Sequence, residues 1–174
     1  MGLQLIFCIE TRNKKGSDWV YIKDTLDQHY QRSRTIKNSP VSMNGKMGFN
    51  NPKVKRKVDQ LIREYKSNGE SRIIYCVDTD DWKTNPQQKK EWQEVQDFCR
   101  THGYDLIWFC RDIEEVFIGF RVDSSVKAEY AAQFRQSKAI QKLEPDRLSH
   151  EEVKERYSNI LLVLDQYLER KEVT

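Results

Sequence analysis

Three carboxylates stand together directly after the most hydrophobic stretch of the chain. Residues 73–82 read IIYCVDTDDW, so Asp78, Asp80 and Asp81 follow five strand-forming residues. In an extended backbone, residues two apart point to the same side, which would bring Asp78 and Asp80 together. Two carboxylates held that close repel each other unless a proton or a cation lies between them. The spacing therefore indicates a cation site, although an Asp-rich turn or helix N-cap also explains the segment.

A further acidic residue, Glu10, stands in the same relation to another apolar run. Glu10 closes residues 3–10 (LQLIFCIE), which are typical of a strand buried on both faces of a parallel sheet. Because function collects at the carboxyl ends of parallel strands, we expect Glu10 beside Asp78 and Asp80. Such hard oxygen ligands suit Mg²⁺ or Mn²⁺. Three of them are the usual arrangement for metal-assisted phosphoryl or phosphodiester chemistry.

Four stretches have the composition of the β-strands that would position these acids. They are 3–10, 35–43, 72–77 and 105–110. The second contains Pro40, which cannot donate a backbone hydrogen bond and therefore suits an edge of the sheet or a bulge. The other three are nearly continuous apolar runs, typical of strands covered on both faces.

Helical segments alternate with these strands. They are expected to begin at Asp18, Pro52 and Pro86 and to fill 125–135 and 150–171. The last follows the capping-box pattern Ser149-x-x-Glu152, and Gly103 is a helix stop; a polar loop is expected at 13–17. This alternation predicts an α/β fold with a mainly parallel, Rossmann-like central sheet, helices on both faces and further C-terminal helices. No linker divides the chain, so we expect one domain over 1–174.

The composition of the chain indicates in which compartment the protein is expected and which kinds of partner it can bind. The 174 residues are 37% hydrophobic and contain neither a membrane-length apolar run nor a signal-peptide pattern, which predicts a cytoplasmic protein with no membrane partner. Four cysteines without a CxxC pair and three scattered histidines predict buried thiols rather than zinc or disulfides. The net charge is only +3, but residues 31–66 hold ten Lys or Arg against two acids. That asymmetry fits nucleic acid as well as it fits a solvated helix face.

Several basic residues are candidate phosphate contacts. They are Lys46 in the glycine-rich loop, Arg111 after the strand at 105–110, and a cluster on the helix that begins at Pro52. The cluster consists of Lys53, Lys55, Arg56 and Lys57. A connecting loop and ordinary surface charge are the alternatives. Trp82, directly after the acids, is the aromatic residue to test for stacking on a base.

The order of these features resembles the Toprim domain of topoisomerases, bacterial primases, OLD-type nucleases and small RNA-processing nucleases. The chain is most similar to the small stand-alone RloB-like branch. The matching segments are Glu10, Gly16-Ser-Asp18-Trp-Val-Tyr21, Asp78-Thr-Asp80 and Ile113-Glu114-Glu115-Val-Phe117. The likeness covers residues 1–121, and 122–174 would be a helical extension.

The resemblance implies a Mg²⁺-dependent nuclease or phosphotransfer enzyme that acts on DNA or RNA, in a mobile-element or defence setting. Glu10, Asp78 and Asp80 would hold Mg²⁺ or Mn²⁺, with Glu10 also a general acid or base. Glu114, preferred to Glu115, would be a further acid near the metal, and Asp81 an outer or helix-capping residue.

Two departures from the family pattern leave a second function open. Thr11 stands where the family usually has glycine, and Arg111-Asp112-Ile113 replace the expected prolines and aromatics. The alternative is a non-catalytic Toprim-like module that binds nucleic acid, a nucleotide or a protein. A response-regulator-like domain needs a lysine at a later strand end, where this chain has Arg111. The sequence gives no oligomeric state.

Overall fold

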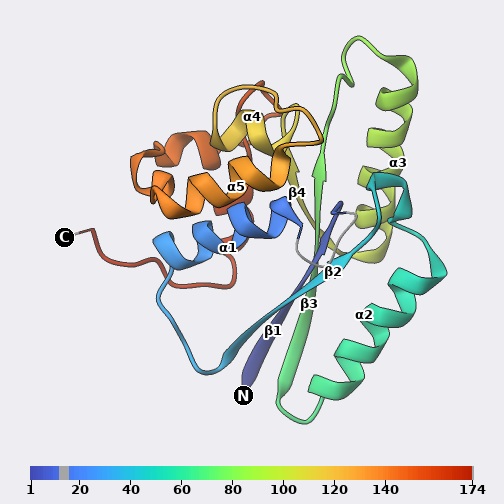
Figure 1. The fold of residues 1–174 in the computed structure, drawn as a ribbon. Helices are drawn as coiled ribbons and strands as arrows, with labels where there is room; N and C mark the ends of the chain where they lie inside the picture. Colours follow the sequence, from blue (N-terminus) through green and yellow to red (C-terminus); the bar gives the residue numbers. More distant parts are fainter. Residues whose placement is uncertain (12–15, 174) are drawn as a thin grey trace. The chain divides into compact units, whose positions relative to one another are not determined.

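The computed structural model describes residues 1–11 and 16–173; residues 12–15, part of the loop predicted at 13–17, and residue 174 lie outside it. Four strands form one parallel sheet in the order β2-β1-β3-β4, flanked by helices (Figure 1). The strands are β1 (Gly2–Ile9), β2 (Ile36–Ser42), β3 (Gly69–Asp78) and β4 (Asp105–Phe109). The predicted α/β class is therefore confirmed. The strand β2, which contains Pro40, lies at an edge of the sheet, one of the two places expected for this proline.

The central strand β1 sets the register of its neighbours. It pairs in parallel with β2 up to Ile9 opposite Ser42, and with β3 up to Ile9 opposite Cys76. Its residues 5–8 are completely buried, as the continuous apolar run predicted. Since both pairings are parallel and end at Ile9, the three strands finish at the same edge of the sheet.

By their internal contacts, the residues form two compact units. Unit 1 consists of Met1–Lys14, Ser33–Val77 and Asp81–Leu106; unit 2 consists of Lys15–Arg32, Asp78–Asp80 and Ile107–Thr174. The chain thus passes several times between the units. A single domain with a core ending at residue 121 stays a prediction.

In unit 1, two helices follow the strands as predicted. The helix α2 (Pro52–Tyr65) lies against β1 and β2, and the side chain of Asn51 caps it. The helix α3 (Pro86–His102) is capped by Asn85 and ends at Gly103, whose φ of +68° is the left-handed conformation that glycine adopts readily. A short 3₁₀ helix, η1 (Lys46–Gly48), lies within the predicted glycine-rich loop.

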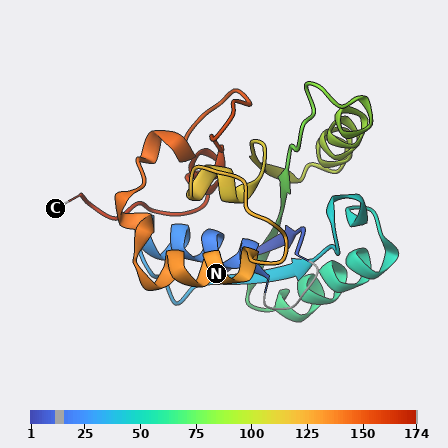
Figure 2. The same ribbon diagram turned by 45° about the horizontal axis from the view of Figure 1, so that its top comes forward.

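In unit 2, the helices α1 (Ser17–His29) and α5 (Lys127–Gln136) lie side by side in both views (Figures 1 and 2). The ring of Tyr21 stacks on Phe117 at 5.1 Å and meets the edge of Phe134 at 5.1 Å. Unit 2 also contains α4 (Ile113–Phe117), η2 (Ala139–Lys142), η3 (Pro145–Leu148) and α6 (Ile160–Leu164). This aromatic contact joins α1, α4 and α5 around one small core.

The predicted helix at 150–171 is wrong. Only α6 (Ile160–Leu164) is α-helical there, because the preceding residues bond to the end of β4 instead. Tyr157 O accepts from Cys110 N at 3.1 Å, and Ser158 forms an antiparallel bridge with Phe109. The capping box is wrong as well, since the hydroxyl of Ser149 donates to the carbonyl of Pro145.

The composition led to expectations about the cysteines and about membrane-spanning segments. All four cysteines are buried, as predicted. Within the described part of the chain, no helix has both the length and the apolar character needed to cross a membrane.

Candidate functional site

The strand β3 ends at Asp78, and the backbone turns immediately after it. Asp80 has a φ of +51°, in the left-handed region, so the expected extended backbone from Asp78 to Asp80 is wrong. The amide of Thr79 donates to Phe109 O at 3.0 Å, and that of Asp80 to Arg111 O at 2.8 Å. These bonds hold the turn, and both aspartate residues remain half-buried.

Asp78 reaches the first turn of α4. Its Oδ1 accepts a hydrogen bond of 3.0 Å from the backbone amide of Ile113. The helix itself is capped by Asp112, whose Oδ1 accepts from Glu115 N at 2.8 Å. Asp78 is therefore oriented by backbone and lies near the two glutamates that the resemblance singles out.

Glu114 is the most enclosed of these acids. It is 0% exposed, and neither carboxylate oxygen has a hydrogen-bond partner within residues 1–11 and 16–173. The ammonium group of Lys127 lies 3.1 Å from Oε2 and forms an ion pair with it. Burial raises the pKa of Glu114 to about 7, a rise that Lys127 limits.

Lys127 is shared by several carboxylates. Burial opposes its charge, yet the pKa of Lys127 is raised because Glu114, Asp78 and Asp112 all act on it. We call Asp78, Asp112 and Glu114, with Lys127, the acidic cluster. Sequence reasoning missed Asp112 and Lys127 as members, because no spacing pattern links the start of α5 to the end of β3.

Tyr21 adds a buried hydroxyl to the same unit. Its side chain is 0% exposed, and the hydroxyl lacks a hydrogen-bond partner in the described structure. Burial raises the pKa of Tyr21, and the negative charges of Glu114, Asp18 and Asp112 raise it further. Tyr21 therefore stays neutral and can donate one hydrogen bond.

Glu115 plays a different part from Glu114. Its carboxylate receives two bonds from the Arg111 guanidinium, of 3.1 Å from Nε and 2.7 Å from Nη2. Arg121 Nε also lies 3.8 Å from Glu115. Arg111 is one of the predicted phosphate contacts. A phosphate that bound it would have to compete with this ion pair. Glu114 is therefore the glutamate that belongs to the acidic cluster.

Glu10 directly follows β1 in unit 1. Its carbonyl accepts a hydrogen bond of 2.8 Å from Gly45 N, which draws the glycine-rich loop to the end of the strand. Gly45 has a φ of +101°, a conformation that a side chain would strain. Thr11 adds to this anchoring, since its carbonyl accepts from the Ser42 hydroxyl. Lys46, a predicted phosphate contact, is only 5% exposed.

The predicted three-carboxylate site draws on both units. Glu10 belongs to unit 1, whereas Asp78 and Asp80 belong to unit 2. Among residues 1–11 and 16–173, no three His, Cys, Asp or Glu side chains are grouped so that they could hold a metal ion. Glu10, Asp78 and Asp80 as joint ligands therefore stay a prediction.

The predicted basic residues of α2 form one exposed surface. Lys53, Lys55, Arg56 and Lys57 are all exposed, whereas Val54 and Val58 on the same helix are buried. We call these four residues the basic face. By sequence, unit 1 holds 16 basic and 9 acidic residues and unit 2 holds 14 and 18, so their net charges are +7 and −4.

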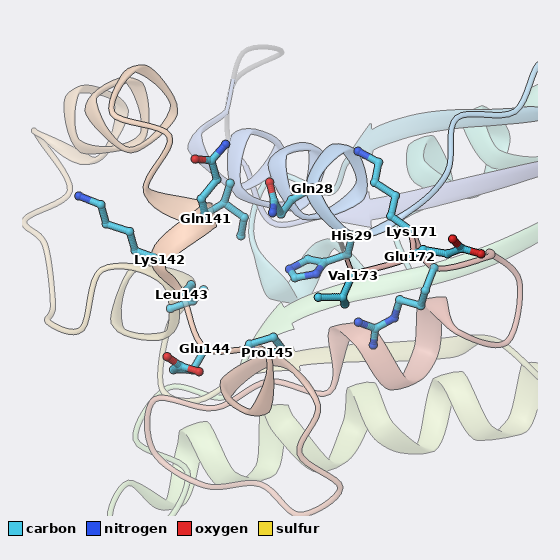
Figure 3. Close-up of a pocket in the computed structure, with 12 residues that line it drawn as sticks. Gln28, His29, Gln141, Lys142, Leu143, Glu144, Pro145, Lys171, Glu172 and Val173 are labelled. Carbon is cyan, nitrogen blue, oxygen red and sulfur yellow. The ribbon is translucent and has the colours of Figure 1, made fainter.

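A pocket of about 650 Å³ lies within unit 2, at the end of α1 (Figure 3). Burial lowers the pKa of His29, which lines it, and the ring's Nε2 has no partner in the described chain. Lys171, another lining residue, donates from its ammonium group to Asp27 O. Three basic and two acidic residues line the pocket, so its charge favours no single class of ligand. No predicted site residue lies there.

No protein-family model, no curated protein and no solved structure matches this chain. The resemblance to Toprim domains therefore rests on the chain's own residues.

Proposed function

We propose that this protein is a Mg²⁺- or Mn²⁺-dependent Toprim-type enzyme that acts on phosphodiester or phosphoryl groups of nucleic acid. The observation that carries the proposal is the acidic cluster. Asp78, at the end of a parallel strand, shares the ammonium group of Lys127 with Glu114, whose side chain is completely buried. Excess negative charge of this kind favours binding of a further cation.

The donor chemistry suits the proposed ion. Mg²⁺ prefers carboxylate oxygens, keeps several waters, and needs only one or two protein carboxylates when substrate phosphates complete its shell. Asp78 and Asp80 would supply these carboxylates, with Glu10 and Glu114 as further acids. Once bound, the ion would polarise the phosphodiester and lower the pKa of an attacking water.

The protein's own residues would position the substrate and move the proton. The amide of Ile113 orients Asp78 through its 3.0 Å bond to Oδ1. Glu10 would act as the general acid or base. The exposed basic face of α2 would hold the phosphate backbone. The net charge of +7 on unit 1 favours binding of a polyanion there, and the net charge of −4 on unit 2 favours binding of a cation.

Calorimetric titration with Mn²⁺ tests the ion site. The double variant Asp78→Asn, Asp80→Asn should lose Mn²⁺ binding, and its asparagine at 78 can still accept the bond from Ile113. The matched control is Asp123→Asn with Asp146→Asn, which removes the same charge from two exposed positions of unit 2. Equal Mn²⁺ affinity of the 78/80 variant and the wild type would remove the metal from the proposal.

Turnover is tested with single- and double-stranded DNA and RNA, each with Mn²⁺ or with a chelator. Metal-dependent degradation that Glu10→Gln abolishes supports the enzyme. The control Glu155→Gln changes an exposed glutamate and should degrade the substrate at the wild-type rate.

One observation favours a second candidate, the non-catalytic module that binds nucleic acid, a nucleotide or a protein. The ammonium group of Lys127 already lies 3.1 Å from Glu114, where a cation would otherwise be expected. Under this alternative, the wild type binds nucleic acid without turnover and binds no Mn²⁺, whereas Lys127→Met gains Mn²⁺ binding. Under the enzyme proposal, the wild type itself binds Mn²⁺.

A further inference from the structure

The turn between β3 and α3 is tied to the helix that follows it. The amides of Thr84 and Asn85 donate to Asp81 O at 3.0 and 2.8 Å. The amide of Asp81 in turn donates to Gln88 Oε1 at 2.9 Å. Asn85 Oδ1 accepts from Gln88 N at 3.1 Å and caps α3. These bonds fix the backbone on both sides of Trp82 and Lys83.

Trp82 and Lys83 form an aromatic–cation pair on this turn. Lys83 is exposed, and its Nζ lies 5.6 Å from the centre of the Trp82 ring. Trp82 is only half-buried, in contrast to Trp92 and Trp108, which are 3% and 5% exposed. Trp82 is therefore more accessible than these two core tryptophans, and the ammonium group of Lys83 lies over its ring.

This combination matches the two halves of a nucleotide. An indole face binds a base by stacking, and a neighbouring ammonium group attracts its phosphate. The pair belongs to unit 1, which carries a net charge of +7 that also favours a polyanion. Trp82 follows Asp80 by two positions, so chain connectivity keeps their Cα atoms within about 7 Å.

We propose that Trp82 stacks on an unpaired base and Lys83 contacts the adjoining phosphate, so that the substrate is single-stranded nucleic acid. A base within a duplex is covered on both faces by its neighbours, and only an unpaired base can lie on the indole. This inference rests on the proposed function, because it names the substrate class of the proposed enzyme. It adds a specificity determinant that the carboxylates alone do not provide.

Binding of labelled oligonucleotides to the full chain tests the proposal, by fluorescence anisotropy in the presence of a chelator so that no substrate is consumed. The wild type should bind single strands more tightly than duplexes. Trp82→Leu should weaken single-strand binding about tenfold, the effect of losing one stacked base, and leave duplex binding unchanged. Trp82→Phe, which retains a ring, should restore most of the affinity.

The role of Lys83 is tested separately, by the dependence of binding on salt concentration. Lys83→Gln should reduce the dependence of binding on salt by the amount that about one neutralised phosphate contributes. The control Lys89→Gln removes the same charge from an exposed position on α3 and should change this dependence less. The thermal unfolding midpoint of each variant, measured alongside, separates a loss of binding from a loss of folding.

The outcomes separate this inference from the function on which it rests. Wild-type affinity in Trp82→Leu, or a wild-type preference for duplexes, would overturn the stacking role, whereas Mn²⁺-dependent turnover would still support the enzyme. If the wild type binds no nucleic acid of any form, both proposals fall.

Discussion

Lys127, the first residue of α5, lies 3.1 Å from the buried carboxylate of Glu114, the second residue of α4. The pair therefore joins two helices of unit 2 through a contact between opposite charges. It also places one positive charge where the resemblance to Toprim domains expects acids and a metal. The behaviour of this pair bears on both stability and function.

Stability should fall as pH rises through the pKa of Glu114. The fold raises this pKa from 4.5 to about 7, so the folded state favours the protonated acid. The resulting stabilisation is fully present below pH 4.5 and is lost as pH rises to about 7, which lowers the free energy of unfolding by up to about 3 kcal/mol. Urea denaturation at pH 5 and pH 8 measures the difference.

Glu114→Gln should remove most of that pH dependence, because glutamine does not titrate. Glu155→Gln, at an exposed position, should retain the wild-type dependence. Asp112 contributes in the same direction, since burial also raises its pKa. An unchanged pH profile in Glu114→Gln would show that Glu114 is ionised as readily in the folded chain as in the unfolded chain.

Removal of Lys127 should cost more stability at pH 8 than at pH 5. Lys127→Met leaves the ionised Glu114 without its cation, whereas the protonated acid at low pH needs none. We expect a loss of about 1–3 kcal/mol at pH 8, the usual cost of leaving a buried group unsatisfied. A double-mutant cycle with Glu114→Gln measures the coupling, and simple additivity of the two losses would argue against a direct interaction.

Arg111 should stabilise the fold through its two bonds to Glu115. Arg111→Lys keeps the charge but loses the paired geometry, so we expect a loss of about 1 kcal/mol in the free energy of unfolding. Arg100→Lys is the control, because Arg100 forms an exposed ion pair with Asp97 on α3. Similar effects of the two substitutions would mean that the enclosed pair contributes no more than a surface pair.

The basic face should control the salt dependence of nucleic-acid binding. Lys55→Gln with Arg56→Gln should lower the slope of log affinity against log salt by about 0.7–0.9 for each phosphate that the variant no longer neutralises. The control is Lys142→Gln with Lys154→Gln, two exposed positions of unit 2. Equal slopes for the two double variants would indicate that α2 does not bind the phosphates.

The local features of the fold could be predicted from sequence. The run at 3–10 predicted β1 because its residues are apolar without alternation, and Pro40 indicated an edge or a bulge because it lacks a donor. Pro52 and Pro86 predicted helix starts and Gly103 a helix end, since each acts through its own backbone. Such signals need only neighbouring residues.

What could not be predicted depends on contacts between distant residues. The apolar spacing at 150–171 is helical, yet bonds of Tyr157 and Ser158 to β4 prevent most of that helix. The left-handed Asp80 breaks the strand alternation that would have aligned it with Asp78. Lys127 became a candidate only through its distance to Glu114, which no local pattern encodes.

Residues Asp78–Asp80 belong to unit 2, although the chain on both sides of them belongs to unit 1. This interleaving has a consequence for biosynthesis. The ribosome releases Asp78–Asp80 well before Ile107–Thr174, the long segment with which they form a compact unit. The nascent chain therefore displays its basic helix α2 first and cannot assemble its acidic cluster until α4 and α5 have emerged. Any cation-dependent chemistry of this protein would begin only after α5 has left the ribosome.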